Sequence, residues 1–191
     1  MQAAAGKRAA WLRYVPFLVL AAFLAAAFLY HQRLDARAEV GAPAPDFTLE
    51  TLDGGKLSLS DLRGKAVLIN FWTTWCPECK DELPALEAFQ RRWGHRIALL
   101  GVNMRETEGL VRPFVQRYGV TYPILLDRFE RVSKVYQVTG VPETWLVDAD
   151  GIAVARFIGP LTEAHLARAV ELLLGDEAAG GPGESGPGGA S

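Results

Sequence analysis

The order of apolar and polar residues along the chain begins with one long apolar stretch. It runs from Tyr14 to Tyr30 without a charged residue. A helix of this length, rising about 1.5 Å per residue, would span roughly 25 Å, close to the thickness of the hydrocarbon core of a bilayer. More basic residues precede the stretch than closely follow it, which favours a cytoplasmic N-terminus. The pattern predicts a signal-anchor transmembrane helix at residues 14–30, with the rest of the chain on the extracytoplasmic side.

A cleaved signal peptide is the alternative, because Ala36-Arg37-Ala38 resembles a small-x-small cleavage site. The apolar stretch is long for a signal peptide, so we expect the anchor to stay attached. Around it we expect a cytoplasmic stub at residues 1–13 and a linker at residues 31–40. A folded domain should follow at residues 41–174. The tail at residues 175–191 should be disordered, because it is rich in Gly and Pro and has almost nothing apolar to bury.

Within the expected domain, short apolar runs alternate with segments of helical periodicity. Strands are expected at residues 47–49, 56–59, 66–72, 97–102, 124–126, 144–147 and 153–158. Helices are expected at residues 83–93, 111–118, 129–136 and 166–174. This alternation predicts an α/β fold, in which helices cover a parallel or mixed sheet and an antiparallel hairpin lies at one edge. Chemistry in such sheets gathers at the carboxyl ends of the strands.

Composition and charge exclude some functions. The 191 residues include 20 Lys and Arg against 22 Asp and Glu, for a formal net charge of -2. This balance leaves no basic surplus to neutralise phosphates, so we expect no nucleic-acid partner. The chain has only 2 cysteines, which excludes a scaffold held by several disulfides and leaves one C-x-x-C pair as the candidate chemistry.

The two cysteines, Cys76 and Cys79, follow a predicted strand and begin a predicted helix. Unpaired N–H groups and the helix dipole favour a thiolate at that place, so Cys76 is the expected nucleophile. Cys79, expected to be more buried, would resolve a mixed disulfide by attacking Cys76. Pro77 suits the first helical turn and stiffens the ring. Glu78 opposes thiolate formation by like-charge repulsion, which stabilises the disulfide and favours reducing behaviour.

Metal binding is an alternative use of the two thiols. A structural zinc site needs four ligands, but His31, His95 and His165 are scattered along the chain. Soft thiolates would also suit Cu(I) in a copper-delivery module, although no histidine is placed to help them. We expect a redox function with no metal and no other cofactor.

The segment FWTTWCPECK, from Phe71 to Lys80, resembles the active site of the thioredoxin superfamily. Pro84 stands where thioredoxins kink the helix of the active site, and Val141-Pro142 stands where they carry a cis-proline loop. The N-terminal run from Gly41 to Leu49, Gly64-Lys65 and the predicted anchor are similar to the ResA/TlpA/CcmG branch. The resemblance covers about residues 41–174.

This resemblance implies a thioredoxin-like fold with an N-terminal β-hairpin extension, preceded by a single transmembrane helix. Proteins of this branch are tethered thiol-disulfide oxidoreductases, commonly reductants of the haem-binding cysteines of apocytochrome c. The implied partners are protein disulfides, with apocytochrome c as the expected client. A reducing pair in an oxidising compartment must also be recharged, which implies a transmembrane thiol donor.

The resemblance also assigns roles outside the cysteine pair. Pro142 matches the cis-proline, which would offer the backbone of Val141 to an extended substrate. Glu82 matches an active-site acid of the ResA type and could relay the proton of Cys79, or be only a solvated acid in the first turn. Glu143 matches an acid that follows the proline in CcmG, where it could contact substrate, or be a surface charge on an edge strand. Trp75 is expected at the rim of the site, where it would contact substrate.

Two positions limit these assignments. Asn70 stands where thioredoxin has a buried Asp, so proton transfer by that route is absent and Glu82 gains interest. A peroxiredoxin-like thiol peroxidase is a rival prediction, since Thr73 lies three residues before Cys76. The Pro expected before that Thr is Ile69 here, and a resolving cysteine at C-x-x-C spacing favours disulfide exchange.

Overall fold

The computed structural model describes residues 14–34 and 37–175, which fall into two units that divide after residue 36. The first unit contains the helix α2 (Val15–Leu34). Among the described residues, no helix combines the length and the apolar character that crossing a bilayer requires. The transmembrane anchor therefore stays a prediction. The predicted stub at residues 1–13 and the predicted tail after Gly175 lie outside the described residues.

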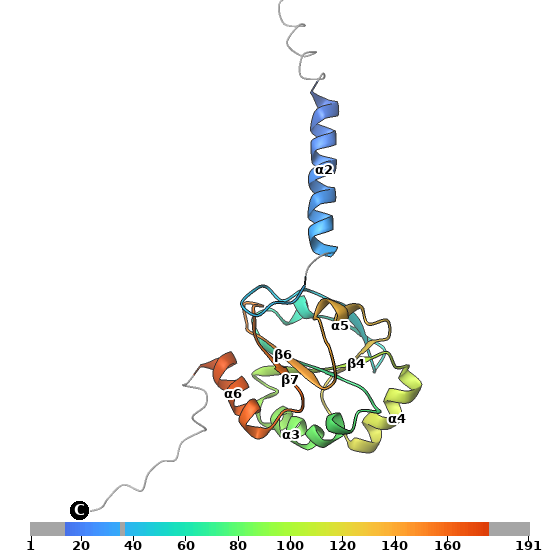
Figure 1. The fold of residues 1–191 in the computed structure, drawn as a ribbon, viewed down its shortest axis with the longest axis vertical. Coiled ribbons are helices and arrows are strands. Elements are labelled where there is room, and N and C mark those ends of the chain that lie inside the picture. The colour runs from blue at the N-terminus through green and yellow to red at the C-terminus, as the bar shows by residue number, and fades with distance from the viewer. Residues whose placement is uncertain (1–13, 35–36, 176–191) are drawn as a thin grey trace, which may run out of the picture. The chain divides into compact units, whose positions relative to one another are not determined.

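The second unit is a seven-stranded mixed sheet with helices on both faces (Figure 1). In chain order its elements are β1 (Thr48–Thr51), β2 (Lys56–Ser58), the 3-10 helix η2 (Leu59–Leu62), β3 (Ala66–Trp72), α3 (Pro77–Trp93), β4 (Ile97–Met104), α4 (Glu108–Tyr118), β5 (Ile124–Asp127), α5 (Arg131–Val135), β6 (Glu143–Val147), β7 (Ala153–Ile158) and α6 (Glu163–Leu174). The strand order is β2-β1-β5-β4-β3-β6-β7. The central strands β3, β4 and β5 are parallel to one another, and all other neighbours are antiparallel.

This architecture confirms the predicted α/β fold with its N-terminal hairpin and its edge hairpin. The predicted strands at residues 66–72 and 153–158 have the predicted bounds. The helix ends also follow the sequence. Gly119 ends α4 in the left-handed conformation, at φ 65°, and Thr162 caps α6 by accepting a hydrogen bond from the amide of His165.

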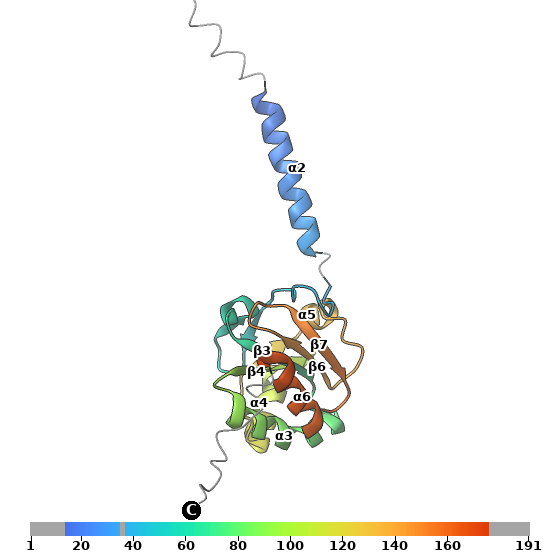
Figure 2. The ribbon, with the colours of Figure 1, turned by 90° about the vertical axis from the view of Figure 1, so that its left-hand side faces the viewer.

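The centre of the sheet is buried on both faces, and β3 shows this most clearly because each of its residues is buried. Leu68 packs in one core cluster with Leu86 of α3 and Val170 of α6, whereas Ile69 packs in the other with Tyr136. Figures 1 and 2 show α3, α4 and α6 on one side of the sheet and α5 on the other. Truncating a residue buried like Leu68 to Ala costs about 2–5 kcal/mol, so the end of β3 is a firm base for the segment that follows.

The domain begins earlier than the sequence predicted. Ala38, expected in the linker, is buried, and its amide donates a 2.9 Å hydrogen bond to the carbonyl of Val135. The side-chain amide of Gln137 donates to the carbonyl of Ala38 at 2.8 Å. These contacts assign residues 37–40 to the domain, because the Ala38 side chain is buried in its core and both backbone polar groups of Ala38 are hydrogen-bonded to it.

Candidate active site

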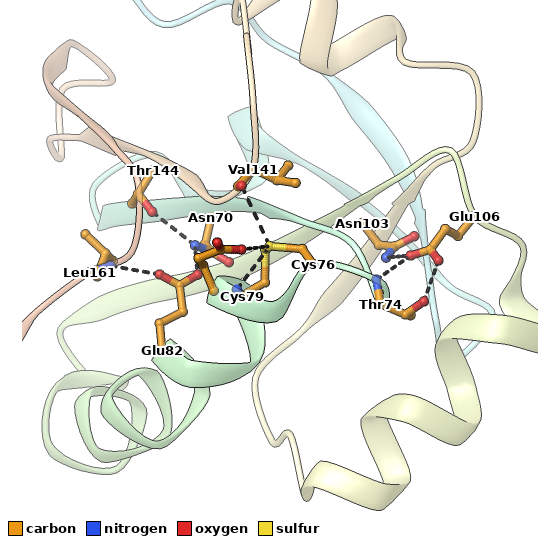
Figure 3. Close-up of a disulfide and its surroundings, with 11 residues drawn as sticks. Asn70, Thr74, Cys76, Cys79, Glu82, Asn103, Glu106, Val141, Thr144 and Leu161 are labelled. Atoms are coloured by element: carbon orange, nitrogen blue, oxygen red, sulfur yellow. Dashed lines mark hydrogen bonds between the residues drawn. A yellow bond between two sulfur atoms is a disulfide. The ribbon is translucent and has the colours of Figure 1, made fainter.

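The two cysteines form a disulfide where β3 ends and α3 begins (Figure 3). Their Cα atoms are 5.3 Å apart. Cys76 is the N-cap of α3, and its Sγ accepts a 3.0 Å hydrogen bond from the amide of Cys79. Pro77 occupies the first turn, where its missing N–H leaves no bond unmade. The same amide that meets the sulfur here would stabilise a thiolate on Cys76 after reduction.

The two cysteines are equally buried, with 1% of Cys76 and 2% of Cys79 exposed. The expectation that Cys79 is the more buried of the pair is therefore wrong for this disulfide form. Neighbouring residues cover both cysteines. An attacking thiolate therefore has to displace some of these residues to reach Cys76.

The cis-proline loop lies over the first sulfur. The peptide bond between Val141 and Pro142 is cis, as predicted. The carbonyl oxygen of Val141 lies 3.7 Å from Sγ of Cys76 (Figure 3). The amide of Gly159 donates to the carbonyl of Pro142 at 2.9 Å, which ties the loop to the end of β7. The structure thus brings together the cysteine pair and the loop that the sequence placed there.

Glu82 is buried one helical turn after Cys79, which rules out the alternative of a solvated first-turn acid. Its Oε1 accepts a 2.9 Å hydrogen bond from Nδ2 of Asn70, and its Oε2 accepts one from the amide of Leu161 at 2.9 Å. Burial raises the pKa of Glu82 to about 7, although the hydrogen bonds from Leu161 and Asn70 oppose the shift. A carboxyl group with this pKa can both accept and donate a proton near neutral pH.

Asn70 holds this carboxyl group from the sheet. It lies opposite Thr144 in the register of β3 and β6, and its Nδ2 also donates to Oγ1 of Thr144 at 3.1 Å. Asn70, Thr144 and Glu82 therefore form one buried polar network beside the disulfide, as Figure 3 shows. The sequence identified the departure at Asn70 but not its bond to Glu82.

Glu143 lies away from the surface, in contrast to both of its predicted roles. Its side chain has no exposed area, and β6 is an inner strand. Arg156 of β7 binds both carboxylate oxygens, with Nε and Nη2 each at 2.9 Å. Trp145 Nε1 donates to the same group at 3.0 Å. The structure thus does not place this carboxylate where a substrate could contact it, and the reason is a partner on the neighbouring strand.

Trp75 and Glu78 are exposed residues that directly neighbour the two cysteines along the chain. Trp75 is 69% exposed, which agrees with its predicted place at the rim of the site. Oε2 of the exposed Glu78 lies 3.8 Å from Sγ of Cys76. This distance permits the like-charge repulsion with a Cys76 thiolate that the sequence predicted.

Glu106 is a site residue that the sequence reasoning missed. It lies between β4 and α4, and its two carboxylate oxygens bind the amide and the hydroxyl group of Thr74, two residues before Cys76 (Figure 3). Nδ2 of Asn103 donates to the same carboxylate. A single Glu after a predicted strand carries no distinguishing signal, so only the fold could reveal this contact.

The described residues contain no group of three or more His, Cys, Asp or Glu side chains arranged to hold a metal ion. The fold and the site instead define a class of protein: a thioredoxin-like domain whose C-x-x-C disulfide faces a cis-proline loop.

The chain belongs to the AhpC/TSA family, whose sequence model matches residues 40–156. It is 38% identical over 135 residues to the thioredoxin-like protein YneN of Bacillus subtilis (strain 168), which covers 69% of this chain and 79% of that protein. It is 35% identical over 141 residues to the thiol-disulfide oxidoreductase ResA of the same strain, covering 73% of this chain and 79% of ResA. Among solved structures, StoA from Bacillus subtilis matches with a TM-score of 0.60 at 29% identity, over 68% of this chain and 99% of that one.

These comparisons confirm the resemblance to the ResA/TlpA/CcmG branch. Together with the disulfide between Cys76 and Cys79, they make the protein a thiol-disulfide oxidoreductase.

Proposed function

We propose that this protein reduces disulfides in client proteins and that apocytochrome c is among its clients. The observation that carries the reducing direction is the 3.8 Å separation between Glu78 Oε2 and Cys76 Sγ. A carboxylate at that distance raises the free energy of a thiolate on Cys76. The disulfide form is then favoured, so the dithiol form is a good electron donor. The choice of apocytochrome c follows the resemblance to the ResA/TlpA/CcmG branch.

Exchange starts from the reduced protein. The Cys76 thiolate attacks one sulfur of the client disulfide, and the second client sulfur leaves as a thiolate that takes up a proton. Cys79 then loses its proton and attacks Sγ of Cys76, which expels the first client sulfur. The client gains two electrons and two protons, and the protein is left with the bond between Cys76 and Cys79.

Glu82 is the proposed base for the second step. Cys79 is buried, so water has poor access to its proton, and Glu82 follows it by one turn on the same helix. Its pKa of about 7 suits a group that takes a proton from Cys79 and later returns it to solvent or to the reduced pair. Asn70 and the amide of Leu161 fix the carboxyl group in place for this transfer.

The backbone of Val141 and the ring of Trp75 are the proposed client contacts. Val141 is only partly buried, and its carbonyl lies beside the reacting sulfur. Trp75 offers a large exposed aromatic surface next to the nucleophile. An extended client segment could pair with the loop while apolar client side chains rest on the indole ring.

The proposal includes a tether and an electron donor. The uncharged apolar stretch from Tyr14 to Tyr30 supports an anchor with the domain on the extracytoplasmic side. A transmembrane thiol-transfer protein would recharge the pair there, since an oxidising compartment does not. Membrane fractionation with protease protection tests both the tether and the side of the domain.

Covalent trapping tests the client. In Cys79→Ser cells the second step is blocked, so a mixed disulfide between Cys76 and its client should accumulate and should contain apocytochrome c. Cys76→Ser is the matched control, because it also leaves one thiol in the C-x-x-C motif but removes the nucleophile. Equal adducts in the two variants would overturn the assigned roles, and adducts that lack apocytochrome c would overturn the proposed client.

A further inference from the structure

We propose that Glu106 is a positioning residue that holds Cys76 at the N-cap of α3 by fixing the loop between β3 and α3. The proposal rests on thiol-disulfide exchange at Cys76 and is independent of the client. It concerns a residue far along the chain from the C-x-x-C pair, in the connection between β4 and α4.

The contact is a clamp of one carboxylate on one threonine. Oε2 of Glu106 accepts a 2.7 Å hydrogen bond from the amide of Thr74, and Oε1 accepts one from the Thr74 hydroxyl at 2.5 Å. Glu106 is only 7% exposed. Hydrogen bonds to a charged acceptor in such a place are stronger than neutral ones, so the clamp fixes both the backbone and the side chain of Thr74.

Two neighbours of Glu106 adopt unfavourable arrangements around it, which supports this role. Asn103 is fully buried and donates its Nδ2 to Glu106 Oε2 at 2.7 Å, yet its Oδ1 has no partner among the described residues. Arg105 adopts the left-handed conformation, at φ 62°, directly before Glu106. Such backbone conformations persist where the surrounding structure over-determines them, often near functional sites. The same carboxylate accepts its other hydrogen bonds from Thr74, in the loop that precedes Cys76.

Thr73 is buried at the start of the loop, whereas Thr74, which the clamp holds, is only partly buried. Trp75, which lies between Thr74 and Cys76, is largely exposed and so provides no packed anchor. Cys76 must nevertheless keep its Sγ 3.0 Å from the amide of Cys79 for the helix terminus to stabilise a thiolate. Loss of the clamp would let the loop shift and lengthen this contact. The thiolate of Cys76 would then lose stabilisation, and exchange would slow.

Two substitutions at Glu106 distinguish an effect of its hydrogen bonds on the position of the loop from an effect of its negative charge. Glu106→Ala removes the clamp. Glu106→Gln keeps its shape, because the amide oxygen can accept from the Thr74 amide and from Asn103, while the amide nitrogen can donate to the Thr74 hydroxyl. If Glu106 acts by positioning, the Gln variant should behave like the parent. If it acted through its negative charge, Gln and Ala would have similar effects.

Glu87 offers a matched control within the same protein. It is 8% exposed and binds the amide and the hydroxyl of Thr121, each at 2.8 Å. This is the same kind of clamp, but it holds the connection between α4 and β5 rather than the loop before Cys76. Glu87→Ala should therefore lower stability without changing the reactivity of Cys76.

The experiment is the pH dependence of alkylation of Cys76 by iodoacetamide in the reduced, full-length chain. Glu106→Ala should move the midpoint of the alkylation profile up by about one pH unit, which slows alkylation severalfold at pH values below the parent midpoint. Glu106→Gln and Glu87→Ala should keep the parent profile. A parent-like profile in folded Glu106→Ala would overturn the proposal, and so would equal slowing in Glu106→Gln or in Glu87→Ala. Because no client is present, failure here leaves the proposed client untouched.

Discussion

Replacing Glu82 by Gln should change how the stability of the protein depends on pH. Burial raises the pKa of Glu82 from its ordinary value of 4.5 to about 7 in the folded protein. In the unfolded chain the same group titrates near its ordinary value. Between these two pH values the folded protein keeps a proton that the unfolded chain has released. The free energy of unfolding should therefore fall as the pH rises through this window.

The size of the effect follows from the shift in pKa. One unit corresponds to about 1.4 kcal/mol, so ionising buried Glu82 should cost about 3 kcal/mol of stability above pH 7. Below pH 4.5 the cost should vanish, since the group is protonated in both states. Gln cannot ionise, so this dependence on pH is absent from the variant. Its amide nitrogen will, however, face either Asn70 or the amide of Leu161, both of which are donors. That clash lowers stability by an amount that does not vary with pH.

The measurement is urea denaturation of the oxidised parent and the oxidised Glu82→Gln variant across this pH window. The difference in unfolding free energy, variant minus parent, cancels the titration of every other group. We expect it to rise by about 3 kcal/mol from the acid end to the neutral end, with most of the change between the two pKa values. Two parallel stability curves would refute the reasoning, because they would mean that Glu82 releases its proton equally easily in both states.

Glu78→Gln should make the disulfide more oxidising by about 20 mV, because like charges about 4 Å apart in water repel by ~1 kcal/mol and 30 mV corresponds to ~1.4 kcal/mol. Equilibration with a glutathione buffer measures the potential, and an unchanged value would show that water screens Glu78 from Cys76. Arg156→Met should lower the free energy of unfolding by about 3 kcal/mol or more, because it leaves the buried Glu143 carboxylate without its bidentate partner. If Arg156→Met unfolded at the same urea concentration as the parent, the ion pair of Arg156 and Glu143 would add no stability.

The sheet could be predicted from the sequence because its strongest signals are local. The continuous apolar run at residues 66–72 is typical of a strand buried on both faces, and β3 has those bounds. The predicted strands at residues 144–147 and 153–158 are separated by a short Asp-Ala-Asp-Gly sequence, and they pair as the antiparallel hairpin of β6 and β7. The start of the domain was less clear, since Ala38 is buried by contacts with Val135 and Gln137, which lie about a hundred positions away.

The reactive centre could also be predicted, but its supporting residues could not. Cys76, Cys79 and Pro142 belong to short motifs with a fixed place in a known fold, and the structure places them together. Glu143 is different, since its environment depends on Arg156, which reaches it across the register of β6 and β7. No periodicity in the sequence connects those two positions.

Glu106 and Glu82 accept hydrogen bonds from different kinds of donor, and this difference underlies the roles that we propose for them. Glu106 accepts from a backbone amide and a hydroxyl of one loop residue, so its contact transmits position to that loop. Glu82 accepts from Asn70 and from the amide of Leu161, neither of which is part of the reacting pair, and it follows Cys79 on the same helix. A proton that arrives at Glu82 can therefore leave again without moving the cysteines. One carboxylate is suited to hold the nucleophile still, and the other to carry the proton that the second thiol must release.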